Sequence, residues 1–141
     1  MANMKKGERY AYAFAQIKKA RTEGFSFEAI ALCESIIADR LWSNVASRNK
    51  GVQGKILDSL LKKAREHLPA DLHNRLDEWR KQRNVAIHEF VKSEPGTAPK
   101  GSLDEALKQA KQTAREGEKL AREVCKWHRS ELNKAKKGAQ R

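Results

Sequence analysis

Four polar residues in one short segment have the types and spacing that suit chemistry on a phosphate: Arg80, Arg83, Asn84 and His88. Histidine titrates near neutrality and can take or give a proton. A guanidinium presents a fork of donors to phosphate oxygens and keeps its charge, and Arg80 with Lys81 adds further cations for phosphate binding. Arg80, Asn84 and His88 follow one another at i, i+4 and i+8, which places them in one polar row on a helix.

Arg83 occupies a different position from this row. At about 100° per residue it falls in the middle of an apolar stripe. The stripe consists of Leu72, Leu76, Trp79, Ala86 and Phe90. A guanidinium in such a place is costly unless its donors are matched by an acceptor or open into a cleft.

Glu34 is the candidate acceptor, because it lies among the apolar positions of an earlier helical segment and its carboxylate should also face the core. A buried carboxylate and a buried arginine both require a partner. Pairing Glu34 with Arg83 satisfies both, although Asp39 or Asp77 could compete. Such a pair is equally compatible with a purely structural role.

The helical geometry raises one difficulty. On a straight α-helix Arg83 and His88 differ by about 140°, so they do not share a face. Either the helix bends near these residues, or a dimer arrangement brings the two side chains together.

The segment Arg83-Asn84-Val85-Ala86-Ile87-His88 resembles the R-N-x-x-x-H signature of the HEPN superfamily (higher eukaryotes and prokaryotes nucleotide-binding). The resemblance extends as a helical layout over residues 27–127. It implies a compact helical bundle that dimerises and brings two motifs together in a cleft. Many members are metal-independent endoribonucleases of toxin–antitoxin, abortive-infection or CRISPR-associated defence systems. It therefore implies Arg83, Asn84 and His88 as catalytic residues, RNA as substrate, and an antitoxin or defence-system partner.

The residue types agree with RNA cleavage. RNA carries its own nucleophile, the 2′-hydroxyl beside each phosphate, so the protein must remove one proton, deliver another and stabilise the developing charge. Each chain contributes a single histidine in the motif, His88. The sequence therefore predicts a homodimer in which acid and base come from two subunits.

Two other functions compete with this one. A binding module of the same fold would hold a nucleotide or RNA in the cleft of Arg80, Arg83 and Asn84 without cutting it. A helical protein could instead coat nucleic acid with dispersed lysines. Those lysines are Lys5, Lys6, Lys62, Lys63, Lys136 and Lys137. The net charge of +12 would attract polyanions in every case, and a solvated face is the more ordinary role for dispersed lysines.

The rest of the chain predicts an all-α fold. In 141 residues the aromatic fraction is only 6 %, so the core must be aliphatic. Apolar periodicity predicts five helices, over about 8–22, 27–48, 56–68, 70–92 and from 103 onward. Ser102-x-x-Glu105 is a capping box for the last one. Short connections predict an up-and-down antiparallel bundle, a single domain over 1–133 with a basic, frayed tail at 134–141.

Several classes of protein are disfavoured. No apolar run is long enough to span a bilayer, and no apolar segment follows the first residues as in a secretory signal, so we expect a cytoplasmic protein without a membrane partner. Cys125-x-x-His128 offers only two metal ligands, and a structural zinc needs about four. We therefore expect no metal and no cofactor, with Cys125 in the core, His128 solvated and Cys33 reduced.

Overall fold

The computed structural model describes residues 2–48, 56–91, 95–97 and 101–139, and within them every regular element is helical. The elements are α1 (Ala2–Glu23), α2 (Ser26–Arg48), α3 (Leu57–Ala64), α4 (Ala70–Arg83), a π-helical turn η1 (Asn84–His88) and α5 (Leu103–Ala139). The predicted all-α class is confirmed.

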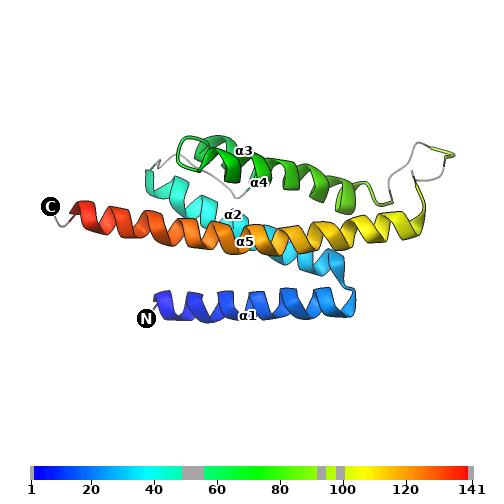
Figure 1. The fold of residues 1–141 in the computed structure, drawn as a ribbon, viewed down its shortest axis with the longest axis horizontal. Coiled ribbons are helices and arrows are strands. Elements are labelled where there is room, and N and C mark those ends of the chain that lie inside the picture. The colour runs from blue at the N-terminus through cyan, green and yellow to red at the C-terminus, as the bar shows by residue number, and fades with distance from the viewer. Residues whose placement is uncertain (1, 49–55, 92–94, 98–100, 140–141) are drawn as a thin grey trace.

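The helices form an elongated antiparallel bundle (Figure 1). Helices α2 and α5 run in the same direction through its centre and share the most extensive contact. Helix α1 lies on one side of them and α3 and α4 on the other, so that α1 begins and α5 ends at the same end of the bundle. Each long helix is antiparallel to the long helix that precedes it, as the short connections predict.

A glycine ends the first helix. Gly24 has a positive φ of 84°, which L side chains rarely adopt, and the backbone N–H of Phe25 donates to the carbonyl of Ala20 at 2.7 Å. The chain then reverses, and α2 begins at Ser26, one residue before the predicted start. This turn brings the end of α1 alongside the start of α2.

Several predicted boundaries differ from the observed ones. Helix α1 begins at Ala2 instead of about residue 8, and the helix predicted over 70–92 is α-helical to Arg83 and π-helical to His88. Helix α3 ends at Ala64, before the predicted residue 68, because a tight turn there directs the N–H groups of His67 and Leu68 to the Ala64 carbonyl. Helix α5 continues through Ala139, so 134–139 are helical and the prediction of a frayed tail from 134 is wrong for them. The N–H of Glu105 donates to Ser102 Oγ at 3.1 Å, as the capping box predicts. Residues 93–101, which separate the fourth and fifth predicted helices, lie mostly outside the described residues.

The core is mainly aliphatic and also contains the indoles of Trp79 and Trp127. Trp79 is 1 % exposed, and its Nε1–H donates to the carbonyl of Thr113 at 2.8 Å, which fastens α4 to α5. Helix α5 can approach this closely because Gly117 lies against the ring: a Cβ at Gly117 would stand 2.8 Å from Trp79 Cζ2. Gly117 therefore sets the distance between the two helices.

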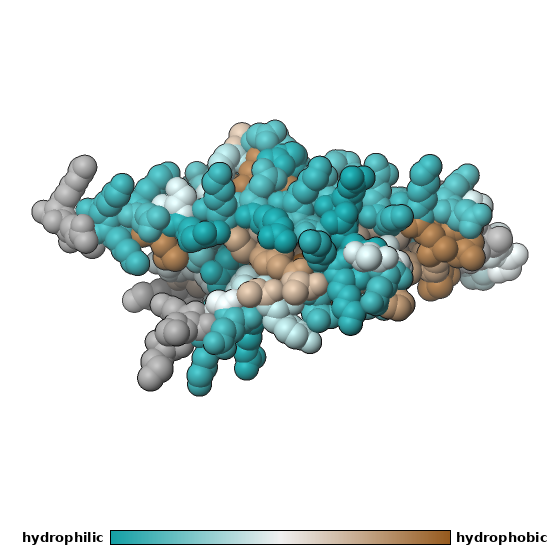
Figure 2. All heavy atoms as spheres, turned by 60° about the horizontal axis from the view of Figure 1, so that its bottom comes forward, coloured by the Kyte–Doolittle hydropathy of each residue, from teal (hydrophilic) through white to brown (hydrophobic). Residues whose placement is uncertain are grey.

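The surface is mainly hydrophilic. Figure 2, which brings the α1 side of the bundle forward, shows hydrophilic side chains over most of that face, with hydrophobic atoms gathered near its middle and toward one end. In the part of the chain that the structure describes, no helix combines the length and hydrophobicity that a membrane crossing requires.

Candidate functional site

The helix that carries the motif widens at the motif itself. From Asn84 to His88 the backbone forms a π-helical turn, and the N–H of Glu89 donates to the carbonyl of Asn84, five residues earlier, at 3.2 Å. A π-turn holds more residues than an α-turn, so residues five apart come onto the same face. The helix is therefore not a regular α-helix here, and of the two alternatives, a local change in the helix or a dimer arrangement, the widened turn within one chain brings Arg83 and His88 together.

Arg83 and His88 consequently contact each other. Arg83 Nη1 lies 3.0 Å from His88 Nε2. Arginine has donors and no acceptor, so the imidazole must accept this hydrogen bond through Nε2 and carry its proton on Nδ1. In this arrangement the lone pair of Nε2 faces Arg83. The His88 side chain is otherwise exposed to solvent.

Glu34 lies on the other side of the same guanidinium. Arg83 Nη2 is 2.8 Å from Glu34 Oε1, so the ion pair predicted between these two residues is confirmed. The Arg83 side chain is 12 % exposed and that of Glu34 is 31 % exposed. Arg83 Nε is buried without a hydrogen-bond partner in the described part of the chain. The guanidinium is thus held by a carboxylate, donates to the imidazole and keeps one buried donor unpaired.

The two competing carboxylates have other partners. Asp39 binds Lys6 Nζ at 2.9 Å, and Asp77 binds Arg80 Nη2 at 3.0 Å. The hydrogen bond from Arg80 lowers the pKa of Asp77 below its ordinary value, against the opposing effect of burial. Neither carboxylate is therefore the partner of Arg83.

Arg80 and Lys81, the cations next to the motif, contact carboxylates outside it. Arg80 donates to Asp77 and also approaches Asp58 Oδ1 at 3.6 Å, and Lys81 Nζ lies 3.7 Å from Asp77. The predicted row of Arg80, Asn84 and His88 is thus divided, because the π-turn moves His88 away from the helical register that the row requires. The structure groups Glu34, Arg83 and His88, and it leaves Arg80 and Lys81 among carboxylates.

Asn84 connects the α-helical and π-helical segments through its backbone. Its N–H donates to the carbonyls of Arg80 and Lys81, and its carbonyl accepts from the N–H of Glu89. The side chain is half-buried and immediately follows Arg83 in sequence. Asn84 therefore stands at the origin of the widened turn.

Hydrophobic residues surround the end of this turn. The ring of Phe90 packs edge-on against Phe27 of α2, with 5.1 Å between ring centroids, and so fastens the end of η1 to the bundle. Val85 and Val91, by contrast, are 41 % and 79 % exposed. The motif therefore lies beside apolar side chains that the chain itself does not cover.

His128 differs from its expected position. It is 7 % exposed instead of solvated, and its Nδ1 has no hydrogen-bond partner among the described residues. Burial, followed by the positive charges of Arg40 and Lys6, lowers the pKa of His128. Cys125, the other member of the Cys-x-x-His pair, is half-buried against the core.

Neither cysteine has the environment of a reactive thiol. Burial raises the pKa of the Cys33 thiol to about 12, and it also raises that of Cys125. In the described residues no three histidine, cysteine, aspartate or glutamate side chains gather as a metal site would require. Glu34, Arg83 and His88 thus remain the candidate for chemistry.

Comparison with known proteins adds no relative. No family model, no curated protein and no solved structure matches this chain.

Proposed function

We propose that this chain is a metal-independent endoribonuclease that cleaves RNA by attack of a 2′-hydroxyl on the adjacent phosphate. The observation that carries the proposal is the contact of 3.0 Å between Arg83 Nη1 and His88 Nε2, made possible by the widened turn. It joins a phosphate-binding group to a proton-transfer group within the segment that resembles the HEPN signature.

Arg83 is suited to bind the reacting phosphate. Glu34 holds one edge of its guanidinium, which fixes the direction of the remaining donors. Nη1 exchanges its acceptor, from His88 to a phosphate oxygen, when RNA binds. This donor and the positive charge of the guanidinium stabilise the negative charge that develops on the phosphorane.

His88 supplies the first proton transfer. When Nη1 turns to the phosphate, the lone pair on Nε2 is free to accept the proton of the 2′-hydroxyl. The 2′-oxygen then bonds to phosphorus, the bond from phosphorus to the 5′-oxygen breaks, and the leaving oxygen takes a proton from a second imidazole that is in its protonated, imidazolium form. The products are a 2′,3′-cyclic phosphate and a free 5′-hydroxyl, and the reaction requires no metal ion.

The second imidazole is His88 of the partner subunit in a homodimer. Val85 and Val91 support this arrangement, because exposed apolar side chains beside a polar site mark an interaction surface. The resemblance further suggests a role in a toxin–antitoxin or phage-defence system, with an antitoxin or activator as a protein partner.

The test is RNA cleavage by the purified chain in EDTA, compared among matched variants. His88→Ala and Arg83→Ala should each abolish cleavage and keep the helical circular-dichroism signal. His67→Ala, which removes a histidine outside the motif, should cleave at the wild-type rate. Cleavage that requires magnesium, or that survives His88→Ala, would refute the mechanism. A chain that binds RNA through Arg83 and cuts none would be the non-catalytic module.

A further inference from the structure

A basic groove lies on the opposite side of the central helices from α4, between α1 and the first half of α5. It encloses about 620 Å³. Five of its lining residues are cationic, namely Lys18 and Arg21 of α1 and Lys108, Lys111 and Arg115 of α5. The remaining two are Thr22 and Gln112, so every residue that lines the groove is charged or polar.

Most of this positive charge is not neutralised. Arg21 forms an ion pair with Glu118, which also binds Arg122. Lys18 and the three cations of α5 form no ion pair with a carboxylate among the described residues. Four cations therefore face the groove without a neutralising partner, which favours a polyanionic ligand.

The cations are arranged in rows. On α5 they stand at i, i+3 and i+7, which places them on one face over about 10 Å of helix axis. Lys18 and Arg21 stand at i and i+3 on the antiparallel helix α1, which forms the opposite wall (Figure 1). Two parallel rows of cations along a groove suit a chain of regularly spaced phosphates.

The chemistry of the lining favours nucleic acid over a membrane. A helix that binds a lipid surface inserts apolar side chains beside its cations. The groove contains none. A strand of phosphates needs only cations and hydrogen-bond donors, which the groove provides.

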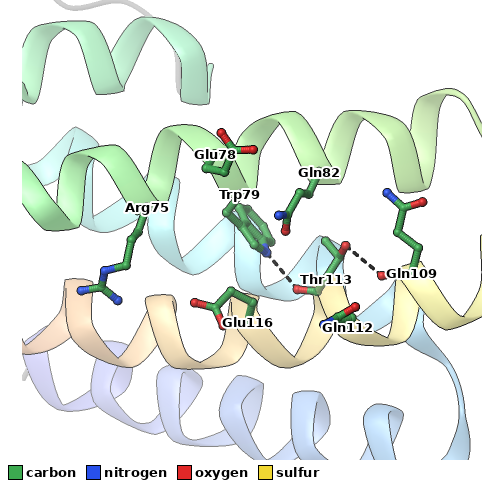
Figure 3. Close-up of a pocket in the computed structure, with 8 residues that line it drawn as sticks. All are labelled: Arg75, Glu78, Trp79, Gln82, Gln109, Gln112, Thr113 and Glu116. Atoms are coloured by element: carbon green, nitrogen blue, oxygen red, sulfur yellow. Dashed lines mark hydrogen bonds between the residues drawn. The ribbon is translucent and has the colours of Figure 1, made fainter.

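A second hollow lies on the other flank of the same part of α5, between α4 and α5 (Figure 3). It encloses about 340 Å³ and is lined by the amides of Gln82, Gln109 and Gln112, by Trp79 and Thr113, and by the charged side chains of Arg75, Glu78 and Glu116. In Figure 3, Gln82 of α4 and Gln109 of α5 extend into the space between the two helices. A primary amide offers a donor and an acceptor side by side, the pattern that matches the edge of a nucleobase.

Gln112 lines both hollows and therefore connects them across α5. We propose that the basic groove and the glutamine-lined pocket form one binding surface for single-stranded RNA, with phosphates in the groove and one base in the pocket. The strand must be unpaired, because a base that enters the pocket is not available to a complement. This inference rests on the proposed function only for the choice of RNA, and the surface shares no residue with Glu34, Arg83 and His88.

The experiment measures binding separately from cleavage. The full chain carrying His88→Ala is titrated in EDTA, by fluorescence anisotropy, against a labelled RNA of about twelve nucleotides and against the same RNA paired with its complement. Lys111→Glu/Arg115→Glu reverses two groove charges. Lys63→Glu/Arg65→Glu makes the same chemical change at exposed positions on the side of α3 and is the matched control. Circular dichroism checks the fold of each variant.

The groove variant should bind single-stranded RNA at least about tenfold more weakly. The slope of log binding constant against log salt concentration should become shallower by about 1.4, since two phosphate contacts are lost. The control should change affinity by less than about threefold. Gln82→Leu/Gln109→Leu should reduce the preference for single strands by about fivefold or more, the contribution of one bound base.

Three outcomes would overturn the inference: equal losses in the groove and control variants, equal affinity for single and paired RNA, or tighter binding to polyglutamate or to anionic phospholipid vesicles. If the groove variant loses binding as expected and the wild-type chain cuts no RNA, the binding surface stands and the proposed ribonuclease fails. If cleavage depends on His88 and the groove variant binds normally, the proposed ribonuclease stands and the binding surface fails.

Discussion

Removing the carboxylate of Glu34 should destabilise the protein by leaving the Arg83 guanidinium without its partner. The Arg83 side chain is only 12 % exposed, so water cannot fully replace the ion pair of 2.8 Å. Glu34 itself is 31 % exposed, which places the pair between an exposed and a buried one. Exposed pairs contribute up to about 1 kcal/mol and breaking a buried pair costs about 3–5 kcal/mol, so Glu34→Ala should cost about 2 kcal/mol.

The two partners should not be equivalent. Arg83→Met keeps the apolar stem and removes the charge, and the Glu34 carboxylate that remains can be hydrated. We therefore expect Arg83→Met to cost about 1 kcal/mol, less than Glu34→Ala, because the more exposed charge is the one left alone. The double variant should be close to Arg83→Met alone, since Glu34→Ala then removes no partner. The cycle should give a coupling energy of about 1–2 kcal/mol.

The assay is urea unfolding followed by circular dichroism. With a slope of about 1–3 kcal/mol per molar urea, the loss in Glu34→Ala should lower the midpoint by about 1 M. Glu34→Gln, which still accepts a hydrogen bond, should lose less. Glu66→Ala, at an exposed carboxylate outside the site, is the control and should change little. A midpoint unchanged by Glu34→Ala would mean that the carboxylate does not hold Arg83 and that the site is not organised as described.

Three further predictions test the bundle and its assembly. Gly117→Ala should destabilise the protein by about 1–3 kcal/mol in thermal melting, because the new methyl meets the Trp79 ring, whereas Gly7→Ala, with open space around it, should stabilise α1 by up to about 1 kcal/mol. Since the folded state lowers the pKa of His128, the unfolded chain binds that proton first as the pH falls. The free energy of unfolding should therefore decrease between about pH 7 and pH 5.5, by at most about 1.4 kcal/mol per pH unit, and His128→Gln should reduce this dependence. Light scattering at tens of micromolar should give twice the chain mass of 16.0 kDa, and Val91→Glu should return it to the monomer value.

Local patterns were sufficient to predict the helices and one contact of the site. Apolar periodicity and the break at Gly24 depend on short-range chemistry, and they place the long helices within a few residues at most ends. The pair of Arg83 and Glu34 follows from the same periodicity, since both charged residues interrupt apolar faces and the helix is regular up to Arg83.

The contact between Arg83 and His88 could not be predicted in this way. A helical wheel assumes about 100° for every residue, and one widened turn changes the direction of each side chain after it. Ala86 in the core and the packing of Phe90 on Phe27 accompany the turn, and such tertiary contacts are invisible to a single-segment pattern. The signal that could have suggested this contact is the spacing of the two residues, because His88 follows five residues after Arg83, the arginine that interrupts the apolar stripe.

The surroundings of His128 and Gly117 depend on other helices and were therefore missed. The sequence analysis expected His128 to be a solvated residue of the last helix, whereas it is 7 % exposed within the bundle. Gly117 lies in the middle of a strongly helical segment, where glycine costs about 1 kcal/mol relative to alanine. A glycine is required at this position because any side chain would meet the ring of Trp79 on α4.

The most direct test of the central claim is the chemical identity of the RNA ends that the chain produces. Wild-type protein is incubated in EDTA with an RNA oligonucleotide, and with the same oligonucleotide carrying a single 2′-deoxy residue at the cleaved position, and the products are analysed by mass spectrometry. Proton transfer by His88 predicts a 2′,3′-cyclic phosphate and a 5′-hydroxyl, no cleavage at the 2′-deoxy position, and no product from His88→Ala. Cleavage at the 2′-deoxy position, or ends bearing a 5′-phosphate, would contradict it.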